Sequence, residues 1–342
     1  MARIALDAMG GDFAPSAPVR GALLALTELP APHRIQLVGM PSVIRGAIDA
    51  ELAAAQAQFA PLVERLDIVE APEVIDMTDK PAATLRGKPH SSMHVALRLQ
   101  PDGLSDAFVS AGNTGAQMAI SSYVLKLHHG LSRPAISTVF PTARRPVVVL
   151  DSGANVDCSP QELLQFARLG AVYAEDLLGR SNPVIGLLSN GEEPEKGNAV
   201  VKEAHHLLAS SGLNFQGNIE GRDLPQGASD RGPFDVVVCD GFVGNVVLKF
   251  YEAVAPFLIG LVARHAGLSS AQLASTFKEL DYSEQGGAPL LGVRGVSIIS
   301  HGKSDPRAIK NAIHVAVRAV ESRMNEHVGR RLQESEPVGG KA

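Results

Sequence analysis

Short apolar runs alternate along the chain with longer segments in which apolar residues recur at helical spacing. Several runs are apolar without interruption, as in strands buried on both faces of a parallel sheet. The predicted strands are 4–7, 35–39, 66–70, 107–110, 147–151, 185–189, 236–240 and 296–300. The predicted helices are 42–59, 114–128, 160–178, 199–210, 243–265 and 306–326. This alternation predicts an α/β fold that is doubly wound around a mostly parallel sheet.

Two helix starts are marked by local chemistry. Ser159 supplies an N-cap hydroxyl, Pro160 takes the first helical position, and Glu162 completes a capping box. Asp305 and Pro306 repeat the combination of cap and proline. Segment 223–233 is predicted to be a surface loop.

Composition and charge narrow the possible functions. A chain of 342 residues fits one large or two coupled α/β domains. A net charge of -5 and an aromatic content of 4% do not favour nucleic-acid binding. The start of the chain has no signal-like segment, and stretch 253–263 is shorter than the roughly 20 apolar residues of a membrane span. We therefore expect a cytoplasmic protein.

Polar, glycine-rich turns follow five of the predicted strands, at 7–12, 110–115, 151–155, 189–193 and 240–245. Strand ends on one edge of an open parallel sheet commonly form a ligand crevice. Glycines let the backbone approach a phosphate, and amides at helix N-termini favour anions. One such turn is an ordinary connector, but five together favour a shared site. The chain has neither a Walker A loop nor a GxGxxG motif in the expected context, so the usual modes of nucleotide binding are disfavoured.

Two charged or titratable side chains near these turns have both structural and functional interpretations. Lys196 follows three glutamates, and it either forms a surface ion pair or neutralises a bound phosphate or oxyanion. His301 follows a predicted strand, where it either stabilises the turn or acts as an acid or base.

Covalent catalysis through an enzyme nucleophile would need an activated thiol or hydroxyl. Cys158 and Cys239 lie beside apolar strands without a histidine at a recognisable spacing, so inert thiols are favoured. Neither has metal-ligand spacing. Ser152 lacks the GxSxG elbow. A mechanism without a covalent enzyme intermediate therefore requires fewer assumptions.

Seven long blocks between residues 4 and 315 resemble the bacterial phosphate acyltransferases of phospholipid synthesis, which are acyl carrier protein:phosphate transacylases. The blocks are IALDAMGGD from Ile4, DMTDKPAATLRGKPHSSM from Asp76, DAFVSAGNTGA from Asp106, LDSGANVDCSPQELLQFARLGAVYA from Leu150, NGEEPEKGN from Asn190, DVVVCDGFVGNVVLK from Asp235 and GGAPLLGVRGVSIISHGKSD from Gly286. The resemblance implies a fold similar to phosphotransacetylases and to isocitrate/isopropylmalate dehydrogenases. By that analogy, region 1–125 is completed by 290–330, region 126–289 forms a second part, and 331–342 is a flexible tail.

The resemblance also implies an activity and a set of site residues. Bound phosphate would attack a long-chain acyl carrier protein thioester directly, giving acyl phosphate without a cofactor or a metal. The implied catalytic residues are Lys196, Asp240, Asn245 and His301. The implied phosphate and thioester site contains Gly10, Gly11, Gly112, Asn113, Thr114, Gly115 and Asn155. Ser189 departs from the expected Asn in its block, which weakens any role for that side chain.

Partners follow from the resemblance as well. Basic residues Lys80, Arg86 and Lys88 would dock the acidic carrier protein. Segment 246–266 would present an apolar tip to the inner face of the plasma membrane, from which a membrane glycerol-3-phosphate acyltransferase takes the product. A buried helix or a homodimer interface is an equally acceptable interpretation of this segment, because it lacks a strongly basic face.

Three rival functions remain open at this level. One is a short-chain phosphotransacetylase that uses acyl coenzyme A on the same fold. Another is a metal-dependent decarboxylating dehydrogenase, for which the chain has neither the metal nor the nicotinamide signature. The third is a non-catalytic scaffold for carrier protein and membrane, which would have no need of the glycine turns.

Overall fold

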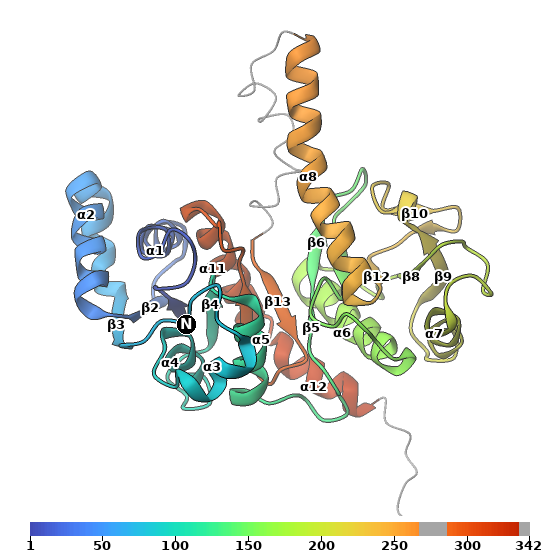
Figure 1. Cartoon of the computed structure of the whole chain (residues 1–342), viewed down its shortest axis with the longest axis horizontal. Coiled ribbons are helices and arrows are strands. Elements are labelled where there is room, and N and C mark those ends of the chain that lie inside the picture. Colours follow the sequence, from blue (N-terminus) through green and yellow to red (C-terminus); the bar gives the residue numbers. More distant parts are fainter. Residues whose placement is uncertain (267–285, 335–342) are drawn as a thin grey trace, which may run out of the picture. The chain divides into compact units, whose positions relative to one another are not determined.

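The computed structural model describes residues 1–266 and 286–334 (Figure 1). The chain divides into two compact units. The first unit is Met1–His129 with Gly286–Gly329, and the second is Gly130–Gln285 with Arg330–Ala342. The sequence placed these divisions at 125/126 and 289/290.

The first unit is built on a mostly parallel sheet. Its strands lie in the order β3-β2-β1-β4-β14-β13, and only β13 runs antiparallel to its neighbour. The bounds are β1 (Arg3–Asp7), β2 (Arg34–Gly39), β3 (Leu66–Glu70), β4 (Ala107–Ser110), β13 (Ala288–Leu291) and β14 (Ser297–Ile299).

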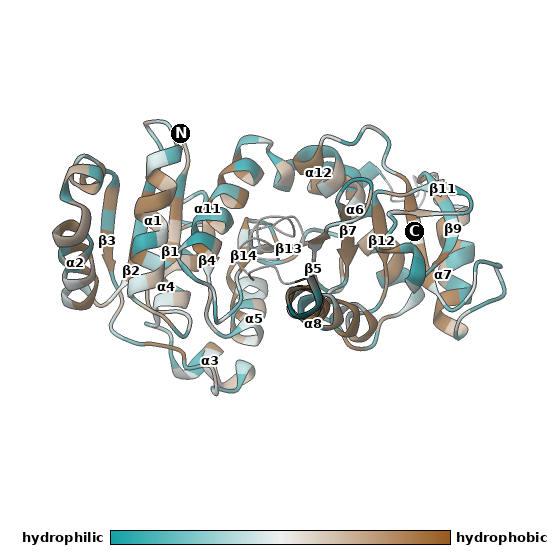
Figure 2. Ribbon diagram, turned by 90° about the horizontal axis from the view of Figure 1, so that it is seen from above, coloured by the Kyte–Doolittle hydropathy of each residue, from teal (hydrophilic) through white to brown (hydrophobic). Residues whose placement is uncertain are grey.

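Helices cover both faces of this sheet (Figure 2). One face carries α1 (Ser16–Glu28) and α11 (Pro306–Glu321), which pack on each other, and the other carries α4 (Ser92–Arg98) and α5 (Thr114–Val124). Buried positions in α1 recur at helical spacing, as the order Val19, Ala22, Leu23, Leu26 illustrates. The doubly wound α/β class is therefore confirmed. The unit also contains α2 (Pro41–Phe59), η1 (Ala60–Arg65) and α3 (Pro81–Gly87), while α12 (Met324–Glu334) runs from the first unit into the second.

The second unit has a five-stranded sheet in the order β6-β7-β12-β8-β9, in which only β6 is antiparallel to its neighbour. The bounds are β6 (Thr138–Phe140), β7 (Val147–Leu150), β8 (Ile185–Ser189), β9 (Phe215–Glu220) and β12 (Val236–Val238). The short strand β5 (Ala135–Ile136) and the hairpin of β10 (Ala228–Ser229) and β11 (Gly232–Pro233) complete its strands, so predicted loop 223–233 contains a hairpin.

Alternate residues of the central strands face different helices. Val147, Val149 and Val237 belong to a buried cluster against which the start of α8 (Gly241–Ala266) packs. Their neighbours Leu150 and Val236 lie against Gly170 of α6 (Pro160–Leu178). Since both faces are covered, these strands are apolar throughout, as the sequence predicted. Helix α7 (Ala199–Ala209) packs beside α6.

Helix boundaries confirm some local predictions and correct others. The capping box at Ser159 and Glu162 is present. Predicted helix 306–326 is instead two helices, because Arg323 adopts a left-handed conformation (φ 55°) between α11 and α12. The predicted tail was placed too early, since α12 continues to Glu334; residues 335–342 lie outside the described part of the chain.

Helix α8 carries exposed apolar side chains over most of its length. These are Phe242, Val246, Phe250, Phe257, Leu258 and Leu261. By length and composition alone, Gly241–His265 could cross a membrane, with a mean hydropathy of 1.8, a test that many soluble core helices also pass. None of its apolar window is buried among residues 1–266 and 286–334, which disfavours the interpretation of 246–266 as a helix buried within this chain.

A close approach between helices α1 and α11 in the first unit generates a stability prediction. A Cβ on Gly21 of α1 would lie 2.6 Å from Ile309 Cβ and 2.9 Å from the carbonyl oxygen of Pro306 in α11. We expect Gly21→Ala to lower the free energy of unfolding by about 1–3 kcal/mol through overpacking, despite alanine's better helix propensity. The control is Gly46→Ala in α2, where a Cβ meets nothing within 4 Å. It should stabilise by about 0.5–1 kcal/mol. Denaturant unfolding measures both, and equal effects would contradict the packing argument.

Candidate functional site

The carboxyl ends of three adjacent strands in the first unit meet at one edge. Turns 7–12, 110–115 and 300–302 follow β1, β4 and β14, respectively. The turns are joined by backbone bonds, since Asp12 donates to the carbonyl of Gly302 and Ser300 donates to the carbonyl of Ser110, both at 2.8 Å. The structure thus brings together Gly10, Gly11, Gly112, Asn113 and His301 within this unit.

Asp7, at the end of β1, is the buried centre of this edge. It is 2% exposed, and its carboxylate accepts hydrogen bonds from Ser110 Oγ (2.7 Å) and the amide of Met9 (3.1 Å). Burial raises the pKa of Asp7, and hydrogen bonds from Ser92, Ser110 and the turn amides oppose the shift. The carboxylate thereby organises the turn around it.

Glycine at position 10 is required by close packing. A Cβ there would lie 2.5 Å from Asp7 Oδ2 and 2.9 Å from the amide nitrogen of Gly112. The amide of Gly112 itself donates to Ser110 Oγ (2.9 Å). Gly10 and Gly112 therefore let two turns approach, and any contact they make to phosphate stays a prediction.

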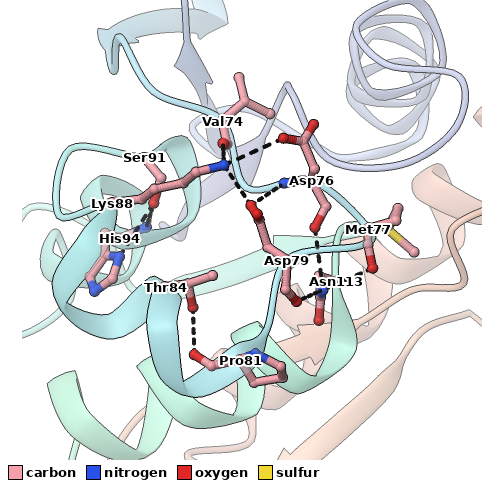
Figure 3. Close-up of polar contacts among 10 residues, drawn as sticks. All are labelled: Val74, Asp76, Met77, Asp79, Pro81, Thr84, Lys88, Ser91, His94 and Asn113. Carbon is pink, nitrogen blue, oxygen red and sulfur yellow. Dashed lines mark hydrogen bonds and ion pairs between the residues drawn. The ribbon is translucent and has the colours of Figure 1, made fainter.

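The side chain of Asn113 is occupied by the protein itself (Figure 3). Its Oδ1 caps α5 by accepting from the amide of Ala116 (3.0 Å). Its Nδ2 donates to the carbonyl oxygens of Asp76, Met77 and Asp79 at 3.0–3.3 Å. Asn113 consequently holds the loop at 76–79 in place through these three hydrogen bonds. The amides of Thr114 and Gly115 lie in the first turn of α5, where no intrahelical acceptor is available, so they suit an anion better.

The predicted carrier-docking residues differ in whether their charges are paired within the protein. Lys88 Nζ contacts Asp79 (2.5 Å), Asp76 (3.4 Å) and the carbonyl of Val74 (2.8 Å), on the other side of the clamped loop. The hydrogen bond to Asp79 raises the pKa of Lys88. Lys80 and Arg86 are exposed. The charge of Lys88 is largely offset locally, which leaves Lys80 and Arg86 as the stronger candidates for docking.

His301 is exposed, and its Nδ1 accepts from the amide of Lys303 (3.1 Å). This bond assigns the proton of a neutral ring to Nε2. The structure therefore presents Nε2 as the ring atom for chemistry, while a role in catalysis stays a prediction.

In the second unit, Asp151 is a buried carboxylate at the end of a strand, as Asp7 is in the first unit. It follows β7 and is fully buried. Its Oδ1 accepts from the amides of Ile136, Gly153 and Ala154 at 3.0–3.2 Å, and its Oδ2 accepts from the backbone and side-chain nitrogens of Asn155 at 2.6 and 2.9 Å. Burial raises the pKa of Asp151, against the effect of these five donors. The side-chain amide of Asn155 also donates to the carbonyl of Pro134 (2.8 Å), so it stabilises the turn.

The start of α8 packs directly onto this turn. The amide of Gly241 donates to the carbonyl of Asn155 (2.7 Å), and a Cβ on Gly244 would collide with the carbonyl oxygen of Asp151, so only glycine fits. Asp240 caps α8 through Oδ1, which accepts from the amide of Val243 (2.8 Å). Asn245 is exposed beside Gly153, with its Cβ 3.5 Å from the position of an added Cβ there.

The loop at 189–198 carries Lys196, whose side chain is exposed. Two long-range contacts and one contact within the loop hold it in place. Buried Asn218 donates to the carbonyl of Glu193 (2.8 Å), Arg231 donates to the carbonyl of Glu192 (2.9 Å), and the amide of Gly197 donates to Asn190 Oδ1 (2.8 Å). Asn218 is in turn held by His205 Nδ1 (3.0 Å). The backbone that presents Lys196 is thus fixed from β9 and from the hairpin.

A hollow of about 490 Å³ lies within the second unit at the carboxyl ends of β8 and β12. Residues at the starts of α6, α7 and α8 contribute to its lining, so three helix N-termini surround it. Of the predicted site residues, Asp240 lines the hollow. The full lining is Leu163, Leu187, Leu188, Ser189, Asn190, Gly197, Asn198, Val201, Cys239, Asp240 and Val243.

Neither thiol has the environment of a nucleophile. Burial raises the pKa of Cys158 to about 12 and that of Cys239 well above its ordinary value. Among residues 1–266 and 286–334, no group of three His, Cys, Asp or Glu side chains is arranged to hold a metal ion.

Solved structures similar to this chain define its class. A phosphotransacetylase from Streptococcus pyogenes superposes with a TM-score of 0.63 and 20% identity over 94% of each chain. A branched-chain phosphotransacylase from Enterococcus faecalis V583 gives 0.60 and 15%, over 94% of this chain and 99% of that one. At such identities the likeness establishes the fold alone, which is the α/β fold of phosphotransacetylases.

Sequence relatives define the family. The family described as "Fatty acid synthesis protein" matches residues 2–327. The phosphate acyltransferase of Desulforamulus reducens is 46% identical over 330 residues, 94% of each chain, and that of Pelotomaculum thermopropionicum is 47% identical over 347 residues, 98% of this chain and 97% of the relative. The chain belongs to this acyltransferase family of fatty acid and phospholipid synthesis.

Several residues of the site could not be inferred from local sequence. Asn218 and Arg231 lie 25 and 39 residues from the backbone that they hold. His205, which contacts Asn218, is part of the same support. The sequence indicated that Asp7 and Asp151 lie at strand ends, but it did not indicate that their carboxyl groups are buried.

The buried carboxyl of Asp7 generates a pH prediction. Its raised pKa means that its contribution to stability is fully present below the unfolded value, about 3.9, and is lost as the pH rises through the native pKa. Asp7→Asn cannot titrate. We expect the melting temperature of the wild type minus that of Asp7→Asn to fall as the pH rises from about 4 towards 8. Exposed Asp102→Asn is the control, and a difference that grows with pH would contradict the shift.

Proposed function

We propose that this protein is a phosphate acyltransferase that converts a long-chain acyl-[acyl carrier protein] and inorganic phosphate to acyl phosphate and free carrier protein, for phosphatidic acid synthesis. The observation that carries the proposal is the match of about 46% identity, over nearly the whole chain, to proteins named phosphate acyltransferase. The strand-end turns, with helix N-termini and an exposed lysine, support anion binding.

The reaction needs one displacement. A phosphate oxygen attacks the thioester carbon, a C–O bond forms, and the C–S bond breaks to release the carrier thiolate. Phosphate is already nucleophilic near neutral pH, so the main task is to hold two reactants in place. In this proposal Lys196, in the second unit, neutralises the phosphate. The amides of Thr114 and Gly115, in the first unit, are a separate candidate for anion contacts.

Charge develops on the thioester oxygen in the transition state. Exposed Asn245 is the proposed amide donor for this oxyanion. Asp240 carries a negative charge at the start of α8, so we assign it to the positioning of that helix and not to phosphate. A thiolate leaves readily and needs no strong acid, and a role of His301 Nε2 in proton transfer stays a prediction. This chemistry requires no cofactor or metal.

Two related functions are separable by substrate. The phosphotransacetylase fold keeps short-chain acyl coenzyme A as the alternative donor, and turnover with acetyl coenzyme A in place of acyl carrier protein would favour it. A non-catalytic scaffold would show no turnover with either donor.

We propose that Lys80 and Arg86 dock the acidic carrier protein. We also propose that the protein acts in the cytoplasm, and that at times it binds the inner membrane surface beside the glycerol-3-phosphate acyltransferase that takes its product.

The decisive variant for the proposed function is Lys196→Ala. With palmitoyl carrier protein and phosphate, we expect kcat/KM for acyl phosphate, trapped as hydroxamate, to fall by about 10²–10³-fold because a charge-stabilising contact is lost. Lys202→Ala, on the exposed side of neighbouring α7, is the matched control and should remain active. Full turnover by Lys196→Ala would contradict a role for this loop in the reaction.

The exposed stripe of α8, defined by Phe242, Val246, Phe250, Phe257 and Leu261, is the proposed homodimer surface. These residues recur mainly at four-residue steps, so they share one helix face. The charges nearby are balanced, since Lys249 pairs with Glu252 at 2.9 Å. Among the described residues of α8 the basic side chains near the stripe are few, namely Lys249, which is paired, and Arg264 and His265 in the last turn. An apolar stripe with so few basic neighbours fits a second copy of the chain better than an anionic lipid surface. Membrane contact remains the second proposed role of α8.

A double variant tests the stripe. Phe250 and Phe257 are 67% and 61% exposed, so Phe250→Glu with Phe257→Glu should leave the fold intact. We expect the wild type to sediment as a dimer and the double variant as a monomer at micromolar concentration. Leu104→Glu, at a 52% exposed position elsewhere, should stay dimeric. A dimer that survives the double substitution, with loss of flotation on anionic vesicles, would assign the stripe to the membrane.

A further inference from the structure

The hollow at the carboxyl ends of β8 and β12 is divided into an apolar floor and a polar mouth. Leu163, Leu187 and Cys239 form the floor and are at most 4% exposed. The mouth is formed by Asn190, Asn198 and Asp240 on the connecting loops, where side chains are exposed or half-buried. Leu188, Val201 and Val243 form the walls. Such zoning fits a ligand that inserts an apolar part and leaves a polar end at the surface.

One polar atom in the wall lacks a partner. Ser189, the last residue of β8, lines the hollow, and its Oγ is buried without a hydrogen bond to any residue that the structure describes. Buried hydroxyls are nearly always hydrogen-bonded. Ser189 therefore marks the level at which a ligand would present an acceptor oxygen, between the floor and the mouth.

The loop that carries Lys196 borders the same hollow. Asn190 and Gly197, at either end of the turn that includes Lys196, both line it. Gly197 has φ +95°, and a Cβ there would lie 2.5 Å from Val201 Cγ1, so the turn packs directly on the wall residue Val201. A ligand that fills the hollow is thus held beside the proposed phosphate-binding lysine.

We propose that this hollow binds the acyl chain of the donor, with the methylenes nearest the thioester against Leu163, Leu187 and Val201, and with Ser189 Oγ as a second donor to the thioester carbonyl beside the proposed Asn245. The inference rests on the proposed function and names the part of its substrate that the second unit recognises. The volume, about 490 Å³, lies within the range of about 300–1,000 Å³ for ligand pockets. The carrier's pantetheine arm is the competing occupant, but its amides would find no partners on an aliphatic floor.

Two substitutions of opposite sense test the proposal. Val201→Phe narrows the hollow from a half-buried wall position, and Leu163→Ala deepens its floor. The readout is the ratio of kcat/KM for long-chain to short-chain acyl carrier proteins, in which a general loss of activity cancels. In the wild type, each methylene that enters should raise kcat/KM by about fourfold, which corresponds to about 0.8 kcal/mol per buried CH₂. In Val201→Phe, kcat/KM should stop rising at a shorter acyl chain length than in the wild type. In Leu163→Ala, the increase in kcat/KM per methylene should be smaller for the methylenes nearest the thioester.

The control lies on the same helix. Val200→Phe adds the same bulk at the adjacent position of α7, which does not line the hollow, and it should keep the wild-type ratio. An unchanged ratio in both Val201→Phe and Leu163→Ala would overturn the proposal. So would an unchanged ratio combined with weaker inhibition by free carrier protein, because that result would place the pantetheine arm in the hollow.

Failure of the inference is distinct from failure of the proposed function. If wild-type protein makes acyl phosphate from acyl carrier protein but the ratio does not respond, only the acyl pocket is refuted. If wild-type protein makes no acyl phosphate from any carrier substrate, the proposed function and the inference resting on it are both refuted.

Discussion

The local architecture depends on buried carboxylates that hold the backbone at the ends of strands. Asp151 accepts five N–H groups from the turn that follows β7 and from the neighbouring segment. Asp7 holds the turn after β1 in the same way, and it also accepts a hydrogen bond from Ser110 on the adjacent strand. A buried charge is costly unless it is hydrogen-bonded, so these turns can adopt few other conformations. Glycines at 10, 241 and 244 follow from this constraint, because any Cβ would collide with the carboxylate or its turn.

The support of the Lys196 loop shows how distant elements serve one exposed side chain. The lysine itself makes little contact with the fold, yet the backbone on either side of it is held by Asn218, Arg231 and Asn190. Such a loop loses little conformational entropy when an anion binds, because its order is established on folding. In our proposal this preorganisation is the contribution of the second unit to catalysis, and the apolar hollow beside the loop adds recognition of the donor.

The sequence predicted most of the strands that are buried on two faces, because such strands are continuously apolar, but it missed β13, whose four residues are all buried. It also predicted the glycine turns and the capping box at Ser159, which are encoded locally. It did not predict α1, whose Pro18 and Gly21 are poor helix formers; its packing against α11 overrides propensity. Edge strand β9 was missed because its residues, Phe215–Glu220, are mostly polar or small. Asn113 lies in the turn after β4, but its side chain is occupied by the loop at 76–79, a contact across more than 30 residues that local sequence does not reveal.

The central claim is that phosphate attacks the carrier thioester directly, without an acyl-enzyme. The raised pKa values of both thiols and the absence of an elbow at Ser152 favour this route. The most direct measurement is rapid-quench release of the carrier thiol from acyl carrier protein, with and without phosphate. Direct transfer predicts no release until phosphate is present. A burst of one thiol per enzyme before phosphate is added would contradict it and require a covalent intermediate.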